Sequence, residues 1–148
     1  MNKELTLEKS YLILVEFLMM SKRRVAEIGA KYNLSSMQAI TLLSLEEPRP
    51  MGDFRHIFNC DASNVTGIID GLEQKQLVKR YEIDSDRRVK LVQLLTNGKR
   101  LRSTLLHELT TDGQYVLADL SDSEAATFIE LIKKITVRSK LTTLSTKG

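Results

Sequence analysis

The chain has 148 residues, 42% of them hydrophobic and 28% charged, which predicts one domain with a buried core and excludes a disordered chain. Its single cysteine excludes an internal disulfide and the cysteine spacings of zinc fingers, and it fits a reducing, cytoplasmic location. The formal net charge of +3 conceals a local excess, because residues 75–102 carry nine Lys or Arg against three Asp or Glu. A local basic segment predicts a polyanionic partner, most simply nucleic acid.

Residues 4–31 predict a long first helix whose apolar residues extend almost all round it. One core-facing stripe would need fewer of them, so we expect a second surface, such as a partner chain, to cover the rest. The longest apolar run, 11–20, is interrupted by Glu16 and is too short to cross a membrane, so no membrane partner is expected. The residues of this helix that we assign to dimerisation are Leu7, Tyr11 and Leu14.

Two shorter helices are expected next. Ser35 and Gln38 have the spacing of a capping box and begin the first of them. Pro48 and Pro50 stop that helix, and the chain restarts near Asp53 in a short helix, the first of a helix-turn-helix.

A further helix begins at Asp61, the expected N-cap residue. Its apolar residues recur at three- and four-residue spacing, so they share one buried face. The opposite face begins with small polar side chains, which suit contacts with base edges. The residues assigned to this contact are Ser63, Asn64 and Thr66.

The segments 78–83 and 89–95 are rich in β-branched or aromatic residues and predict a two-stranded hairpin. The turn between them ends in two adjacent arginines, which suit phosphates or a minor groove. Two further cations lie on the hairpin beside the tip and are expected to meet phosphates. The expected DNA contacts of the hairpin are Arg80, Arg87, Arg88 and Lys90.

After Gly98 a long helical pattern continues past Gly113 as far as Leu117. A last helix is expected to begin near Ser121 or Ser123, and its assigned dimerisation residues are Val137 and Leu141. The whole order predicts a mainly α fold with a small β-hairpin, in one structural domain overall. A winged helix-turn-helix lobe (35–98) would be flanked by a helical dimerisation region formed by 1–34 and 99–148.

Several motifs resemble those of the MarR family of bacterial transcription regulators. They are MGDFRHIF, CDASNVTGIIDGLE and DSDRR, followed by LTNGKRL. The resemblance implies a homodimer with interlaced terminal helices, bound to a pseudo-palindromic operator in double-stranded DNA and most often a repressor. It also implies a small-molecule effector in the crevice between the dimer helices and the DNA lobe. It places Ser36 and Gln38 at a helix N-terminus that meets phosphate, and Asp86 beside one wing arginine, so that the other is aimed.

The sequence departs from the family pattern at three places. Gly71 stands where the family usually has arginine, which lowers helix propensity by about 1 kcal/mol relative to alanine. Gln76 stands where a glycine usually ends the helix, so a left-handed cap there would be strained or replaced. One extra residue falls at the pair Leu94-Leu95, which predicts a bulge or a shifted face in that strand.

Other classes of function are less well supported. No convergent nucleophile and base, carboxylate pair or phosphate-binding glycine loop is visible, so neither an enzyme nor a cofactor is expected. His56 and Cys60 are only two possible ligands and do not make a metal site. One alternative is a thiol-based oxidant sensor using Cys60, although a small turn residue is the preferred interpretation. Another is a winged-helix protein-interaction module without DNA binding, to which Gly71 lends some weight.

Overall fold

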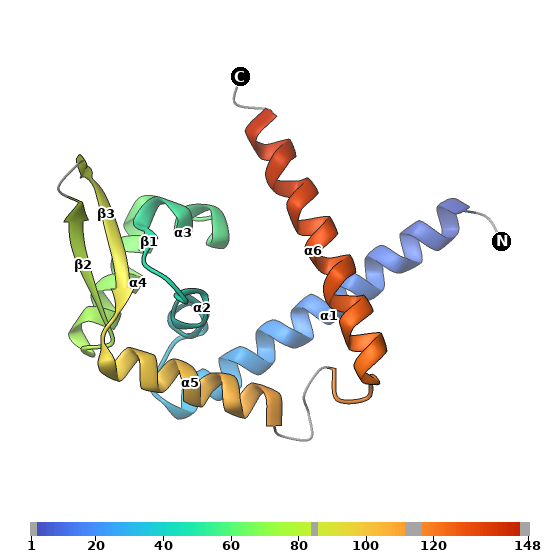
Figure 1. Cartoon of the computed structure of the whole chain (residues 1–148), viewed down its shortest axis with the longest axis horizontal. Helices are drawn as coiled ribbons and strands as arrows, with labels where there is room; N and C mark the ends of the chain where they lie inside the picture. The colour runs from blue at the N-terminus through green and yellow to red at the C-terminus, as the bar shows by residue number, and fades with distance from the viewer. Residues whose placement is uncertain (1–2, 84–85, 112–116, 146–148) are drawn as a thin grey trace. The chain divides into compact units, whose positions relative to one another are not determined.

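The computed structural model describes the backbone of residues 3–83, 86–111 and 117–145, and the side chains of residues 6–83, 86, 88–111 and 117–136. The described chain is mainly helical with one small antiparallel sheet, which confirms the predicted fold class (Figure 1). The elements are α1 (Lys3–Lys31), α2 (Ser36–Ser44), β1 (Arg49–Pro50), α3 (Met51–Phe58), α4 (Ala62–Gln74), β2 (Val78–Ile83), β3 (Asp86–Leu94), α5 (Thr96–Thr111) and α6 (Asp122–Ser145). They cluster into two compact units, Met1–Asp112 and Gly113–Gly148.

The sheet has the strand order β1-β3-β2, and both pairings are antiparallel. β2 and β3 form the predicted hairpin, which we call the wing. The sequence does not predict β1, because two residues are too few to show an alternating pattern. Arg49 pairs with Val92 and Pro50 with Leu91, so β1 joins the start of α3 to the wing. A proline is tolerated there because β1 is an edge strand.

The register of the wing differs from the expectation. Leu94 pairs with Val78, and the next four pairs toward the tip are regular. The irregularity lies between Glu82 and Ile83. The prediction of a bulge or shifted face at Leu94 and Leu95 is therefore wrong. Leu94 is buried, and a shift there would turn it out of the core, whereas the tip can take up extra chain without that cost.

The core of the first unit draws apolar side chains from α1, from α2 to α5 and from the wing. Phe54 of α3 is completely buried and its ring stacks on that of Phe58, with 6.0 Å between ring centroids. This core holds α3, α4 and the wing together as one lobe. Its fully buried members include Ile28, Leu42, Ile69, Leu72, Val92 and Leu105.

The C-terminal end of α1 is attached to α5 through one carboxylate. Glu108 accepts hydrogen bonds from the Lys31 Nζ, at 2.6 Å, and from the Tyr32 hydroxyl. These bonds, that of Lys31 first, lower the pKa of the Glu108 carboxyl. The end of α1 is thereby held by charge as well as by packing.

The N-terminal half of α1 presents apolar side chains to solvent. Leu7 is 61% exposed and Tyr11 68%, whereas Leu14 is half-buried. Despite this apolar content, none of the helices within the described residues is long and apolar enough to span a membrane. Val137 and Leu141 lie in α6, and their side chains fall outside the described residues.

α5 ends at Thr111, and Leu117 lies in a turn, so the prediction of a helix through Leu117 is wrong at its C-terminal end. α6 begins where it is expected. The Ser121 hydroxyl accepts from the Glu124 N–H at 3.4 Å, and the Glu124 carboxylate accepts from the Ser121 N–H at 2.9 Å. This reciprocal pair is a capping box, which confirms the predicted start near Ser121.

α4 ends in a left-handed residue that is not glycine. Gln76 has a φ of 55°, its N–H donates to the Glu73 carbonyl at 2.8 Å, and the Leu77 N–H donates to the Leu72 carbonyl at 3.0 Å. These two bonds are the Schellman pattern, in which glycine usually takes the left-handed position. The expectation was that a left-handed cap at Gln76 would be strained or replaced. The structure keeps the left-handed cap, and Gln76 bears the strain.

Replacing Gln76→Gly is therefore expected to raise the free energy of unfolding by about 0.5–1 kcal/mol, because relief of the left-handed strain exceeds the entropy glycine adds to the unfolded chain. Urea denaturation measures this change. Gln76→Ala is the matched control, since it removes the side chain but keeps the strain, and it is expected to give no gain. A less stable Gln76→Gly variant would contradict the assignment.

Candidate nucleic-acid interface

The start of α4 is organised by Asp61, the N-cap residue that the sequence predicts. Its backbone is extended, and its Oδ1 accepts from the Asn64 N–H at 2.9 Å and from the Ser63 hydroxyl at 2.8 Å. Both bonds stabilise the ionised carboxylate, and they lower the pKa of Asp61, the Asn64 bond most strongly. The first turn of α4 is thus fixed before any ligand binds.

Because of this pKa shift, the stability that the Asp61 cap contributes depends on pH. Because the pKa of Asp61 is lower in the folded than in the unfolded chain, its contribution is present above the unfolded value near 3.8 and is lost as the pH falls through the folded pKa. We expect the urea midpoints of wild type and Asp61→Ala to differ at pH 7 and to converge as the pH falls below 3.8. Asp53→Ala, an exposed carboxylate in the first turn of α3, is the control. A midpoint difference that stays constant over this range would contradict the assignment.

The three polar residues assigned to base contact differ in whether their side-chain hydrogen-bonding groups are free. The Thr66 hydroxyl donates to the Ala62 carbonyl at 2.9 Å, and the Ser63 hydroxyl is engaged by Asp61. Asn64 is exposed, and its carboxamide makes no hydrogen bond within the described residues. It can donate and accept at once, as recognition of an adenine edge requires. Asn64 is therefore the strongest base-contact candidate of the three.

Arg80 joins the wing to α4. Its side chain donates to Glu73 Oε2 from Nε at 3.0 Å and from Nη2 at 2.5 Å, and to Asp70 Oδ1 at 2.5 Å. Its backbone N–H also donates to Glu73 Oε1 at 2.7 Å. These partners, Glu73 first, raise the pKa of Arg80. In this structure the Arg80 side chain therefore holds the wing against α4. This role differs from the phosphate contact that the sequence predicted for Arg80.

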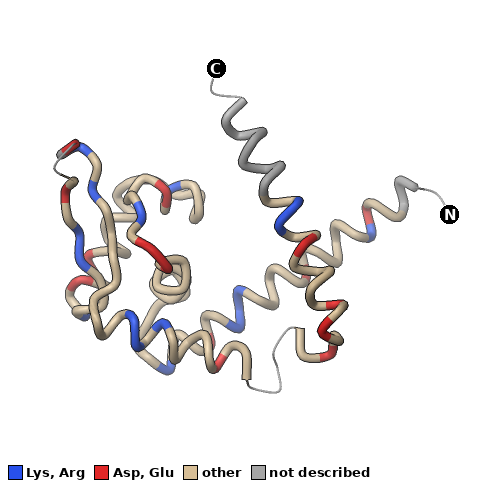
Figure 2. Tube along the Cα trace, in the orientation of Figure 1, with Lys and Arg blue, Asp and Glu red and all other residues tan. Residues whose placement is uncertain are grey.

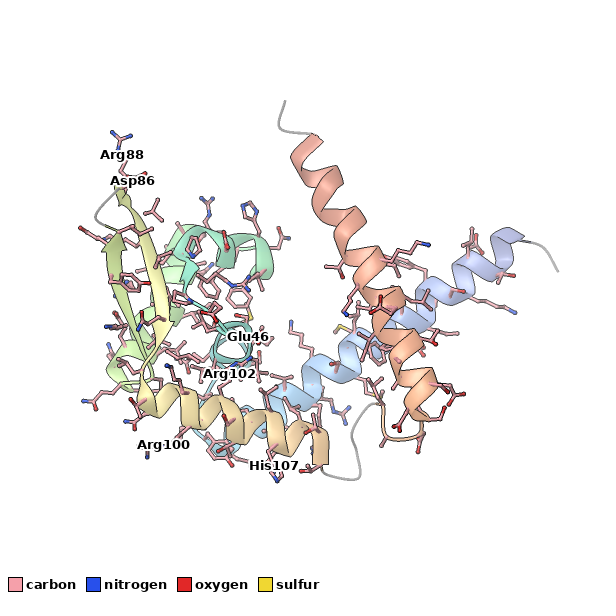
Figure 3. All side chains as sticks on the ribbon, in the orientation of Figure 1. Glu46, Asp86, Arg88, Arg100, Arg102 and His107 are labelled. Carbon is pink, nitrogen blue, oxygen red and sulfur yellow. The ribbon has the colours of Figure 1, made fainter. Side chains whose placement is uncertain are left out.

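The tip of the wing projects into solvent with Asp86 and Arg88 (Figure 3). Asp86 Oδ1 accepts from the Arg88 backbone N–H at 3.0 Å. Asp86 therefore supports the turn, and it forms no ion pair with the Arg88 guanidinium. Its expected pairing with Arg87 falls outside the described residues. Arg88 keeps an exposed guanidinium, and the side chain of Arg87 lies outside the described residues.

Further cations lie along the wing and at the start of α5 (Figure 2). Lys90 is exposed and pairs in register with Glu82 on β2. A carboxylate directly opposite an amine in a strand pair weakens its attraction for phosphate. Lys90 therefore has less positive charge to offer than Arg88.

The start of α2 lies against the C-terminal part of α4, where Gln38 approaches Gly71. The predicted capping box is confirmed, with Gln38 N–H donating to the Ser35 hydroxyl at 3.2 Å and Ser35 N–H donating to Gln38 Oε1 at 3.1 Å. A Cβ on Gly71 would lie 2.5 Å from Gln38 Nε2. Gly71 thus leaves room for the capping side chain, and a larger residue would displace it. Ser36 is half-buried, and its hydroxyl makes no hydrogen bond within the described residues.

Sequence reasoning missed the exposed Arg55 of α3. Arg55 lowers the pKa of Asp61 through its charge, although this is the smallest of the causes. It also lines a small cavity of about 170 Å³ beside Thr66. The signal that could have identified Arg55 was its position as a basic residue on the short helix before α4. Cys60 is half-buried against the core, and no group of three or more metal-ligating side chains occurs in the described part of the chain.

Comparison with known proteins gives the same fold. Residues 25–90 match the model of the MarR family. The chain is 28% identical over 97 residues to the HTH-type transcriptional regulator YpoP of Bacillus subtilis, a match that covers 65% of this chain and 68% of that one. The transcriptional regulator BldR from Sulfolobus solfataricus superposes with a TM-score of 0.75 at 26% identity, over 93% of this chain and 99% of that one. A mutant of MarR from E. coli in complex with operator DNA shares the fold, with a TM-score of 0.66 at 21% identity over 91% and 99% of the two chains.

Proposed function

We propose that the chain is a transcription regulator of the MarR family, and that it acts as a homodimeric, effector-responsive repressor on a pseudo-palindromic operator. Residues 35–98 would form the DNA-binding lobe, and 1–34 with 99–148 the dimerisation region. The operator complex of the E. coli relative supports DNA as the partner.

The observation that carries the proposal is the coupling of two kinds of contact in one lobe. Asn64 offers a free carboxamide at the start of α4, and Arg88 offers an exposed guanidinium at the wing tip. Arg80 fixes wing and helix together through Asp70 and Glu73. A helix in the major groove would then select sequence while the wing binds backbone or minor groove.

A homodimer is supported by the exposed apolar face of α1. Its large side chains between Leu7 and Met20 are mostly more than half exposed, a pattern that favours a covering surface. A dimer would also place two lobes on half-sites about one helical turn apart, which one lobe alone could not engage. A ligand that altered the lobe separation would weaken binding, and this is how we propose that an effector acts.

The roles of Asn64 and Arg88 are separable by experiment. Asn64→Ala is expected to cost about 1–3 kcal/mol on the preferred site and to relax sequence preference, because a base contact is lost. Arg88→Ala is expected to weaken binding to all duplexes alike and to reduce the salt slope by about one per lobe, because a phosphate contact is lost. Fluorescence anisotropy with specific and scrambled duplexes measures both.

The matched control is Lys22→Ala, which removes an exposed cation from α1 outside the lobe and is expected to leave affinity and slope unchanged. Equal effects of Asn64→Ala on specific and scrambled duplexes would contradict the base contact. If neither wild type nor variants bound DNA, a protein-interaction module would replace the proposal.

A further inference from the structure

A small cavity of about 170 Å³ lies between α3 and α4, and we call it the α3–α4 notch. Both helices belong to the first compact unit. Sites for small molecules usually measure about 300–1,000 Å³, so the notch suits a single chemical group better than a whole small molecule. It is lined by Met51, Gly52 and Arg55 of α3 and by Ala62, Val65 and Thr66 of α4.

The notch has a buried apolar floor and an exposed rim. Val65 is buried and Met51 half-buried, whereas the other lining residues are exposed. A Cβ on Gly52 would meet nothing within 4 Å, so the rim is open at that residue. An apolar hollow that opens to solvent gains free energy when an apolar group of a partner fills it.

The α4 side of the notch offers methyl groups. The Thr66 hydroxyl donates to the Ala62 carbonyl at 2.9 Å, so the group that Thr66 has left for a partner is its methyl. Ala62 and Thr66 are four residues apart and share a face of α4, next to the residues assigned to base contact. In the major groove thymine is the base that presents a methyl group, and Ala and Thr methyls are its usual contacts.

The rim of the notch also carries a cation. Arg55 is exposed, and its guanidinium makes no hydrogen bond or ion pair within the described residues. Its charge acts on Asp61, so it lies near the start of α4, where the Asp61 carboxylate is already held by Ser63 and Asn64. The first helix of a helix-turn-helix crosses the DNA backbone, so a phosphate is the partner that fits Arg55.

We propose that the α3–α4 notch binds the C5-methyl group of a thymine, while Arg55 at its rim binds a phosphate of the same duplex. The inference rests on the proposed function. It adds to that function one thymine that each operator half-site must contain, read by apolar contact and independently of the Asn64 carboxamide.

The test replaces each thymine of the preferred duplex, one at a time, by deoxyuridine, which removes only the methyl group. The preferred duplex is the one that wild type selects from a random-sequence pool, and fluorescence anisotropy measures affinity. Burial of one methyl group favours binding by about fourfold. We therefore expect one thymine in each half-site at which the replacement weakens binding about fourfold.

Variants of the lining residues assign this ratio of thymine to deoxyuridine affinity to the notch. Thr66→Ser removes the methyl, keeps the hydroxyl and is expected to reduce the ratio to about twofold or less. Ala62→Leu fills the notch and is expected to abolish the ratio. Asn64→Ala is the control, because Asn64 does not line the notch, and it is expected to weaken binding but to keep the ratio. Arg55→Gln is expected to keep the ratio and to reduce the salt slope by about one per lobe.

A ratio near one at every thymine of the wild-type duplex would overturn the proposal, as would a ratio that survives both Thr66→Ser and Ala62→Leu. An unchanged salt slope in Arg55→Gln would overturn the phosphate contact. In each of these cases the chain still binds DNA, so the proposed function stands. Selection of no duplex at all would overturn the regulator and the notch together.

Discussion

Gly98→Ala is expected to lower the free energy of unfolding by about 3 kcal/mol, at the upper end of overpacking changes. A Cβ at this position would lie 2.0 Å from the Leu77 carbonyl oxygen and 2.9 Å from its carbon. That carbonyl already accepts the Leu95 N–H at 2.9 Å, so it cannot move without breaking a bond at the root of the wing. Helix propensity favours alanine by only about 1 kcal/mol, so the clash decides the sign.

Gly67→Ala is the matched control. Gly67 lies in the interior of α4, where a Cβ would meet nothing within 4 Å. Helix propensity then acts alone, and we expect a gain of about 1 kcal/mol. Urea denaturation of both variants measures the pair. A Gly98→Ala variant as stable as wild type would show that the α5 start does not lie so close to Leu77.

Arg80→Met is expected to destabilise the fold by about 2 kcal/mol and to weaken DNA binding at least about tenfold, because the wing loses its charged attachment to α4. The side chains of Arg80 and Glu73 are 28% and 29% exposed, so solvent screens the pair only partly, and Asp70 at 45% adds less. Without Arg80, two carboxylates would remain side by side near the proposed DNA surface. DNA affinity is therefore expected to fall by more than the loss of folding stability alone would cause.

A double-mutant cycle isolates this attachment. Arg80→Met, Glu73→Gln and the double variant are expected to show a coupling of about 1–2 kcal/mol in urea denaturation. Lys79→Met, an exposed cation on the same strand, controls for lost charge and is expected to affect stability little. Additive single changes, or a Lys79→Met variant that loses as much DNA affinity as Arg80→Met, would contradict the positioning role.

The elements that sequence predicted well are those whose signals are local. Ser35 with Gln38 and Asp61 lie next to the amides they cap, so residue type and spacing suffice to predict them. The apolar spacing of α4 and the alternation of the wing are local as well. The DNA contacts assigned to α4 and to the wing tip, by contrast, remain predictions.

What sequence could not predict depends on contacts between distant residues. Arg80 resembles any other cation of the basic segment until the fold brings Asp70 and Glu73 to it. Gly71 looks like a weakness in a helix until Gln38 is seen against it. Gly98 was part of a recognised motif, but the carbonyl that requires a glycine there belongs to Leu77, which precedes β2 and is 21 residues away in the sequence.

The register error has a similar cause. Counting residues locates an insertion between Asp86 and Thr96 but cannot say which position absorbs it. The buried Leu94 holds the strand in register with Val78, so the irregularity moves toward the solvent-exposed tip. Likewise β1 has only two residues, which are too few to show the alternating pattern of a strand.

The most direct test of DNA binding is the salt dependence of wild-type affinity for the DNA upstream of the chain's own reading frame. We expect binding at low salt, with the logarithm of the association constant falling linearly against the logarithm of salt concentration, at a slope of about −0.9 per phosphate contacted. A dimer contacting phosphates from two lobes would give a steep slope, and a scrambled duplex would bind more weakly. Failure to bind any duplex at low salt, or an affinity independent of salt, would contradict the proposed function.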